Sequence, residues 1–340
     1  MDRPFWHPDV HADRRPRLLA RGGIKAALRG WFAAAGFTEV ECGAVQVSPG
    51  NETHLHGFAV EWRPEGGVAE TRYLHTSPEF AAKKLLAAGE TRIVDFARVW
   101  RNGETSPLHA PEFTMIEWYR AGAPWTAVMA DSVALCRTAL AAAGRPALAW
   151  RDRTCDPLAD PEILTCVAAF ERHAGIDLAA RLDDRDGLAA DVAAAGITVA
   201  ADDNWSDLFS KVIATRIEPQ LGLGRLTLLT EYPIAEAALA RPLARDPRFA
   251  ERFELYACGV ELANGFGELT DAAEQRARFE ADMAAKARIY GRRYPIDEDF
   301  LAALAQMPPA SGVALGFDRL AMLSLGARHI AEVIWTPFPV

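Results

Sequence analysis

Two strand-like segments, 93–101 and 112–120, most strongly limit what this chain can fold into. Both are rich in β-branched and aromatic residues, and the loop between them contains Gly103, Pro107 and Pro111. Parallel neighbours would require a crossover connection, so a loop of this kind predicts two adjacent antiparallel strands. Because the loop is also rich in charged and polar residues, it has the character of a functional loop.

The remaining elements mix helices and strands without regular alternation. Helices are expected at 18–35, 127–143, 161–173, 205–219, 271–290 and 317–325, and a further one begins at Thr76-Ser77-Pro78-Glu79 and ends at Gly89. Strands are expected at 37–42, 253–258, 260–263 and 312–316. This order predicts an α+β fold, an antiparallel sheet flanked by helices. We interpret 1–340 as one catalytic domain with a mostly helical insertion at about 125–248.

Composition excludes several classes of protein. The net charge of −9 argues against a broad basic surface for nucleic acid. The five cysteines have no paired spacing, which fits neither a disulfide framework nor a zinc site. His54 and His56 would share a strand face, but the sequence offers no third metal ligand for them, so a metal site there is not expected. The charged, proline-containing start is no signal peptide, and no apolar run reaches the length of a membrane span, so a cytoplasmic protein is expected.

The segment around the first two strands carries candidate binding residues. Strand parity puts Phe113, Met115, Glu117 and Tyr119 on one face. An aromatic ring on a sheet can stack on a base, and Arg101 at a strand end can hold a phosphate. For any one of these residues taken alone, a solvated hairpin with a half-buried aromatic face is the favoured interpretation.

Three acids recur at intervals of seven residues, at Glu254, Glu261 and Glu268. Acids among apolar neighbours are costly to bury unless they are paired or bind a cation. Carboxylates are also the ligands that Mg²⁺ prefers, normally shared with phosphate oxygens. Surface acids on alternating strands are the alternative interpretation.

The segment 312–320 runs from a strand of small residues into a helix. Its glycines allow a ligand to approach closely, and Arg319 near the helix start can meet a polyphosphate. An ordinary strand-to-helix corner would have the same pattern.

Taken together and in this order, these segments resemble the signature motifs of class II aminoacyl-tRNA synthetases. Residues 101–113 resemble motif 2, 312–320 resemble motif 3, and the weaker motif 1 falls around 34–49. Residues 76–79, 111–119 and 261–266 are similar to the lysyl branch, and most of all to the elongation factor P lysine ligases. The resemblance extends from about residue 18 to residue 333 and is less specific between motifs 2 and 3.

The resemblance implies a role for each matching residue. Arg101 and Arg319 would be catalytic, with Arg101 on the α-phosphate and Arg319 on the far end of the triphosphate. ATP would be bound by Arg101, Asn102, Glu104, His109, Phe113, Glu261, Leu262, Gly316 and Arg319, with Phe113 stacked on adenine. Lysine would be bound by Ser77, Glu79, Glu117, Tyr119, Asn264, Glu268 and Ala314, with Glu79 and Glu268 countering its two ammonium groups. Glu254 and Glu261 would hold Mg²⁺.

Two positions depart from the family pattern. Gly103 stands where the family commonly has an acid that reads the adenine amino group, and Glu104 is expected to take over that task. Ala110 replaces an asparagine, so one polar contact to ATP is expected to be missing.

The resemblance implies an ATP-dependent activation of lysine or (R)-β-lysine and its transfer to a lysine of elongation factor P, by a homodimer. Only about 17 residues precede the first expected helix, too few for the OB-fold that grips tRNA in full lysyl-tRNA synthetases. A minimal enzyme that charges tRNA, and a non-catalytic regulator, are the alternatives. The identity of the lysine isomer stays open.

Overall fold

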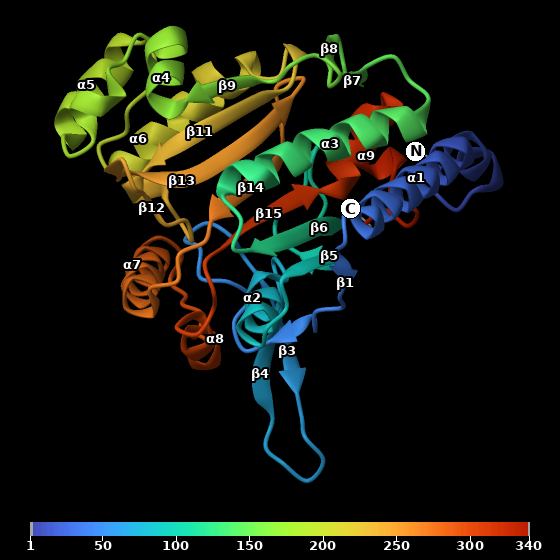
Figure 1. Cartoon of the computed structure of the whole chain (residues 1–340), viewed down its shortest axis with the longest axis horizontal. Helices are drawn as coiled ribbons and strands as arrows, with labels where there is room; N and C mark the ends of the chain where they lie inside the picture. Colours follow the sequence, from blue (N-terminus) through green and yellow to red (C-terminus); the bar gives the residue numbers. More distant parts are fainter. Residues whose placement is uncertain (1–2, 339–340) are drawn as a thin grey trace.

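A nine-stranded, mostly antiparallel sheet forms the centre of the computed structural model, which describes residues 3–338 (Figure 1). Its spatial order is β1 (Thr38–Glu39), β5 (Arg92–Trp100), β6 (Glu112–Ala121), β15 (Ala310–Gly316), β14 (Val260–Gly267), β13 (Asp246–Ala257), β11 (Thr227–Pro233) and β9 (Glu162–Thr165), while β12 (Pro242–Leu243) pairs with β13. Within this sheet β1 and β5 pair in parallel, as do β11 and β9. The expected α+β fold is confirmed, and β5 and β6 are antiparallel neighbours as predicted.

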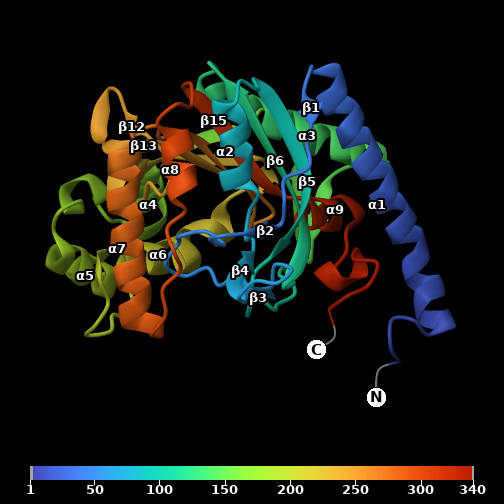
Figure 2. The same ribbon diagram turned by 90° about the horizontal axis from the view of Figure 1, so that it is seen from below.

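One face of the sheet is covered by α1 (Pro8–Ala34), α3 (Trp125–Ala143) and α9 (Phe317–Leu325) (Figures 1 and 2). The alternation of side chains along β6 explains why. Ile116 and Trp118 are fully buried against these helices, whereas Phe113 and Met115 pack with residues of the opposite face. The face left free of α1, α3 and α9 is therefore the one that can hold a site.

Helix α3 has the length and composition of a membrane span, with a mean hydropathy of 1.3 over its most apolar window. Half of that window is buried in the protein, where Val128, Leu135 and Ala139 are part of the core beneath the sheet. Contact with the sheet accounts for the apolar character of this helix.

Two smaller groups of helices flank the sheet. In the first group, α2 (Glu79–Ala87), α7 (Ala272–Tyr290) and α8 (Glu298–Leu304) share a core with the ends of β5, β6 and β15, and Phe80 stacks on Phe300 at 4.2 Å between ring centroids. In the second group, α4 (Cys166–Ala174), α5 (Arg185–Ala194) and α6 (Trp205–Val212) pack on β11 and β13 around Phe170 and Phe209.

Two small sheets complete the described chain. Strands β2 (Val45–Gln46), β3 (Phe58–Trp62) and β4 (Glu70–Leu74) form a sheet whose β3–β4 hairpin projects from the body (Figure 1). Strands β7 (Leu148–Trp150), β8 (Arg153–Asp156) and β10 (Gly224–Arg225) form the other.

Several expected boundaries require correction. The first helix starts at Pro8 rather than at 18, because its first turns are polar on all sides and lack the apolar spacing used to locate the helix. The segment 37–42 contains a strand of only two residues, β1. Gly89 follows α2 closely, as predicted, and its φ of +111° explains why a glycine stands there.

The segment 161–173 is a strand followed by a helix, not one helix. β9 ends at Thr165, whose side chain caps α4 by accepting a hydrogen bond from the Ala168 amide at 3.2 Å. The expected helix at 205–219 divides into α6, a π-helical turn at Ile213–Ile217 and a 3₁₀ turn at Glu218–Gln220. Residues 125–248 contain strands as well as helices, and β9 and β11 from this segment belong to the main sheet.

Candidate active site

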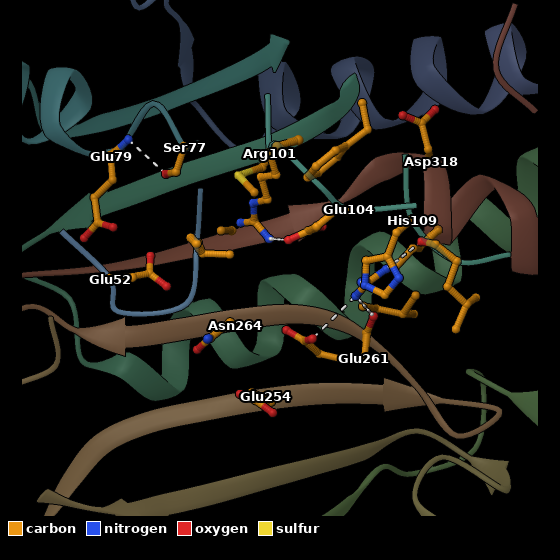
Figure 3. Close-up of a pocket in the computed structure, with 18 of the residues that line it drawn as sticks. Glu52, Ser77, Glu79, Arg101, Glu104, His109, Glu254, Glu261, Asn264 and Asp318 are labelled. Carbon is orange, nitrogen blue, oxygen red and sulfur yellow. Dashed lines mark hydrogen bonds and ion pairs between the residues drawn. The ribbon is translucent and has the colours of Figure 1, made fainter. Parts of the chain in front are cut away.

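A cavity of ≈ 330 Å³ lies on the face of the sheet that α1, α3 and α9 leave free (Figure 3). Strands β6, β13, β14 and β15, the loop after β5 and the loop around residue 52 all contribute to its wall. Thirteen of the predicted site residues line it, namely Ser77, Glu79, Arg101, Glu104, His109, Phe113, Glu254, Glu261, Leu262, Asn264, Ala314, Gly316 and Arg319.

Four predicted residues are not part of the cavity wall. Glu117, Tyr119 and Glu268 are buried behind it. Glu117 accepts a hydrogen bond from Ser77 of the wall and another from Tyr119, and Glu268 pairs with Lys83, which also pairs with Glu79 of the wall. Asn102 is exposed, and its backbone amide donates to the His56 carbonyl at 2.6 Å. The structure therefore brings together all the predicted residues except the Asn102 side chain.

Arg319 lies at one end of the cavity, in the first turn of α9. Its Nη1 donates to the Glu261 carbonyl at 3.0 Å and lies 3.4 Å from the Glu261 carboxylate, while Nε donates to the Leu108 carbonyl at 3.3 Å. Two of these three partners are neutral carbonyls, and the carboxylate contact is long. Most of the positive charge of Arg319 is therefore left to act on the cavity.

His109 is the third neutral partner of Arg319. Burial, followed by the charges of Arg319 and Arg101, lowers the pKa of His109 to about 4, so the ring is neutral at pH 7. Its Nε2 is 2.6 Å from Arg319 Nη2 and its Nδ1 is 2.7 Å from Ser106 Oγ. The network assigns Nε2 as the acceptor from Arg319 and leaves Nδ1–H to donate to Ser106.

Arg101 and Phe113 form the middle of the cavity. The guanidinium of Arg101 lies over the Phe113 ring at 5.4 Å from its centroid, and its Nε donates to the Thr76 carbonyl at 3.3 Å. The loop turns at Gly103, whose φ of +86° is one that side-chain-bearing residues rarely adopt. That turn directs Glu104 into the cavity wall, with its carboxylate 3.9 Å from Arg101.

Glu254 and Glu261 are neighbouring carboxylates on β13 and β14. Burial, followed by the charge of Glu254, raises the pKa of Glu261. Glu254 accepts hydrogen bonds from Arg252 Nη2 at 2.7 Å and from the Tyr256 hydroxyl, which leaves one lone pair on each oxygen. Two repelling carboxylates of this kind fit a divalent cation, which would relieve the repulsion.

The opposite end of the cavity is acidic. Glu117 accepts hydrogen bonds from Ser77 Oγ and from the Tyr119 hydroxyl, both at 2.6 Å. Burial, followed by the charge of Glu79, raises the pKa of Glu117 to about 8. This carboxyl group therefore carries its proton at neutral pH until a cation approaches.

Glu79 and Glu268 share a cation that the sequence interpretation omitted. Lys83 Nζ lies 2.5 Å from Glu79 and 2.7 Å from Glu268. Burial lowers the pKa of Lys83, but the charges of Glu268 and Glu79 outweigh this and raise it overall. Burial also raises the pKa of Glu268 to about 7, against the charge of Lys83. Glu79 and Glu268 therefore share one cation inside the protein, and their roles towards the two ammonium groups of the donor stay predictions.

Gly312 makes room for this acidic end. It lies opposite Tyr119 in the β15–β6 pairing, and a Cβ at this position would come within 2.3 Å of the Tyr119 ring and 2.5 Å of Glu268 Oε1. Both side chains are nearly inaccessible and cannot move away easily.

Asp318 lies behind the end of the cavity that Arg319 occupies, the arginine end, and holds the surrounding elements together. It accepts hydrogen bonds from Arg21 Nε at 3.0 Å, from Arg21 Nη2 at 2.7 Å and from the Thr114 amide at 2.7 Å. One buried carboxylate thereby joins α1, β6 and α9. The position of Arg319, the next residue, is fixed by these bonds.

Sequence reasoning missed Glu52, Lys83, Arg252 and Asp318. Lys83 follows Glu79 by one helical turn and Arg252 precedes Glu254 by two strand positions, so spacing gave a usable signal for both. Asp318 directly precedes Arg319. No periodicity marks Glu52, which lies in an irregular loop.

Comparison with known proteins agrees with this geometry. Residues 9–340 match the family model described as tRNA synthetases class II (D, K and N). The chain is 38% identical over 332 residues, 97% of its length, to elongation factor P–(R)-β-lysine ligases of Salmonella arizonae, Salmonella paratyphi B and Salmonella heidelberg. The match covers 96% of each of these relatives.

Proposed function

Because the chain belongs to the class II tRNA synthetases of the D, K and N type, we propose that it activates lysine or (R)-β-lysine with ATP and transfers it to a lysine of elongation factor P. The chain is accordingly an ATP-dependent ligase. The relatives named for this reaction match it along almost its whole length.

One observation carries the proposal, namely the opposite charge of the two ends of a single cavity. Arg101 and Arg319 suit the phosphates of ATP, and Phe113 offers an apolar ring to the adenine. The carboxyl groups of Glu52, Glu79 and Glu117 suit a substrate with two ammonium groups. A lysine carboxylate bound between these ends would face the α-phosphate.

The reaction needs no protein nucleophile. An oxygen of the lysine carboxylate attacks the α-phosphorus, the bond from that phosphorus to the diphosphate breaks, and an aminoacyl-adenylate forms. Arg101 and Arg319 would bind the anions as they approach and stabilise the charge of the transition state. The acceptor amine then attacks the acyl carbon, an amide forms, and AMP leaves.

Glu254 and Glu261 would hold Mg²⁺ against the phosphates, as their repulsion and remaining lone pairs favour. Bound there, the ion would neutralise phosphate charge. On the protein side, Arg252 orients the Glu254 carboxylate, and Arg319 contacts Glu261.

The two departures from the family pattern affect the adenine end. Glu104 lies at the cavity wall behind the turn at Gly103, which supports its proposed role in reading the adenine amino group. Ala110 lies in the wall as well and offers no polar side-chain atom.

We further propose that the enzyme is a cytoplasmic homodimer in which the whole chain acts as one catalytic unit. A translation factor is the acceptor in the relatives' names, and translation is a cytoplasmic process. Charging of tRNA is the second candidate function, which the description of the family favours. A non-catalytic role is disfavoured because Arg101, Arg319 and the two acids proposed to hold Mg²⁺, Glu254 and Glu261, line one cavity.

The acceptor is tested by incubating the protein with ATP, Mg²⁺ and either lysine isomer, with elongation factor P and bulk tRNA offered separately. The expected result is a mass gain of one lysyl group on the factor, with tRNA uncharged. Charged tRNA beside an unmodified factor would overturn the choice of acceptor. The isomer that gives the higher kcat/KM identifies the donor.

A further inference from the structure

The loop 51–57 presents a carboxylate, Glu52, that none of the predicted roles includes. The Glu52 side chain is open to the cavity and lies beside Glu79 (Figure 3). Enclosure by the surrounding protein raises the pKa of Glu52, with Glu79 adding to the rise and Arg101 opposing it. Within residues 3–338 its carboxylate has neither a hydrogen bond nor an ion pair.

The other three carboxyl groups of the acidic end already have partners. Glu79 and Glu268 share Lys83, and Glu117 accepts from Ser77 and Tyr119. A substrate with two ammonium groups brings two positive charges to this end. Of the four carboxylates, Glu52 is therefore the one that has no hydrogen-bond or ion-pair partner within residues 3–338.

The loop that carries Glu52 is fixed by α7 and the segment after it. Lys286 is fully buried, and its Nζ donates to the carbonyls of Glu52 at 3.0 Å, Thr53 at 2.9 Å and Leu55. Thr53 Oγ1 also donates to Asp282 Oδ1 at 2.7 Å. An ammonium group that satisfies three carbonyls holds the loop backbone in one conformation.

Further contacts fix both ends of the loop. Asn51 Nδ2 donates to the Pro295 carbonyl at 3.2 Å, and the Gly57 amide donates to the Tyr294 hydroxyl at 3.0 Å. Glu52 thus sits on a backbone held at several points, while its own side chain is left free to bind. Such an arrangement is typical of a preorganised recognition residue.

The position of Glu52 indicates which ammonium group it meets. Glu52 and Arg101 line the same cavity, whereas Glu268 is paired with Lys83 and Glu117 lies behind the wall on Ser77. The donor carboxylate has to approach the phosphate held by Arg101. The ammonium group nearest that carboxylate is therefore the one within reach of Glu52, and the terminal ammonium group extends towards Glu117.

Resting on the proposed function, we propose that Glu52 binds the ammonium group adjacent to the donor carboxylate and is thereby a specificity-determining residue. The position of this group is what distinguishes α-lysine from β-lysine. A carboxylate on a fixed loop reads that position, because a shift of one carbon changes the distance between the two charges.

The test combines changes in the enzyme with changes in the ligand. KM for both lysine isomers is measured by ATP–diphosphate exchange in the wild type and in Glu52→Gln. Inhibition constants are measured in the same assay for 6-aminohexanoate, which lacks the amino group near the carboxylate, and for norleucine, which lacks the terminal one. Inhibition does not require that an analogue be turned over.

In the wild type, the preferred isomer is expected to bind at least about tenfold more tightly than 6-aminohexanoate, as a charge-assisted hydrogen bond implies. In Glu52→Gln this ratio is expected to fall to within about threefold, while the ratio to norleucine stays unchanged. Glu65→Gln, an exposed acid in the β3–β4 turn, is the matched control and should leave both ratios as they are.

An unchanged ratio to 6-aminohexanoate in Glu52→Gln, with wild-type thermal stability, would overturn the assignment of Glu52 alone. Equal weakening of all four ligands would also overturn it, since it would indicate a general loss of the pocket. Absence of exchange with both isomers in the wild type is a different result, and it would overturn the proposed function together with this inference.

Discussion

The two ends of the cavity keep their charges available in different ways. At the arginine end, Arg319 is held mainly by neutral partners, the carbonyls of Glu261 and Leu108 and the ring of His109. At the acidic end, Glu117 is held by hydroxyl groups and keeps a raised pKa. One end is thus permanently cationic, whereas the other becomes anionic as pH rises or as a cation binds.

This difference suits the two substrates. ATP carries negative charge throughout the physiological pH range. A guanidinium group is always protonated, so it can bind ATP without taking up or releasing a proton. An acidic pocket of several close carboxyl groups cannot hold all of its charges without a counter-ion. The donor supplies that counter-ion, so binding and ionisation are coupled at one end only.

The largest effect should come from removing the fixed charge. Arg319→Ala is expected to lower the rate of adenylate formation by about 10³-fold, as loss of a single charged group at a transferring phosphoryl centre typically does. ATP–diphosphate exchange measures it. Arg328→Ala, an exposed arginine a few residues further on, is the control and should retain full activity. An Arg319→Ala enzyme with undiminished exchange would remove Arg319 from the reaction.

The second prediction concerns pH, which should affect binding of the donor at the acidic end but not binding of ATP at the arginine end. With the pKa of Glu117 at about 8 in the free enzyme, lowering the pH protonates a carboxyl group that meets the donor. We expect kcat/KM for the donor to rise by up to about tenfold per pH unit between pH 6 and 8. KM for ATP should stay nearly constant, because His109 titrates at about pH 4.

The same shift affects stability with a definite sign. Folded Glu117 binds its proton more tightly than the unfolded chain does, so its contribution to the free energy of unfolding is largest at low pH and is lost as pH rises through 8.

A donor KM that does not change between pH 6 and 8 would contradict the kinetic prediction. It would show that the acidic end is already ionised, and the contrast between the ends would disappear.

A third, smaller effect concerns the loop that carries Glu52. Lys286→Met removes three hydrogen bonds to the loop backbone and should raise KM for the donor about tenfold, with KM for ATP changed less than about twofold. Lys211→Met on α6, remote from the cavity wall, is the control. If KM for ATP rose as much as KM for the donor, Lys286 would support the whole fold rather than the acidic end.

The smallest effect tests the turn in the motif 2 loop. Gly103→Ala forces a Cβ into a left-handed conformation with φ +86° and should cost about 1 kcal/mol in the free energy of unfolding. Gly22→Ala on the exposed face of α1 is the matched substitution, and it should stabilise the protein by about 0.5–1 kcal/mol. Urea denaturation compares the two, and a neutral Gly103→Ala would mean that the loop adopts another conformation.

The central sheet was predictable because its strands have strong local patterns. The alternation in 112–120 correctly separates Phe113 and Met115 from Ile116 and Trp118. The start of α1 and the strand β9 were missed. Polar residues of α1 contact the distant C-terminal part of the chain, through Arg14 and Arg17, and β9 pairs with the distant β11. Propensity and spacing carry no information about such partners.

The candidate site shows the same division. Arg101, Phe113 and Arg319 were found because they stand at fixed places in recognisable segments, and the structure gathers them in one cavity. Which carboxylates are free was not predictable, because it depends on Lys83 packing against Glu268 from far along the chain. Counting acids in the sequence predicts the sign of the charge in the pocket, but it does not show which carboxyl groups lack a partner within the protein.

The attachment of the loop at 51–57 to α7 has a consequence for biosynthesis. A ribosome releases residue 52 more than two hundred residues before Lys286, so the carbonyls of Glu52, Thr53 and Leu55 lack their buried donor until most of the chain has been made. A contact this distant in sequence closes late and slowly. The acidic end of the cavity therefore reaches its final form only near the end of translation.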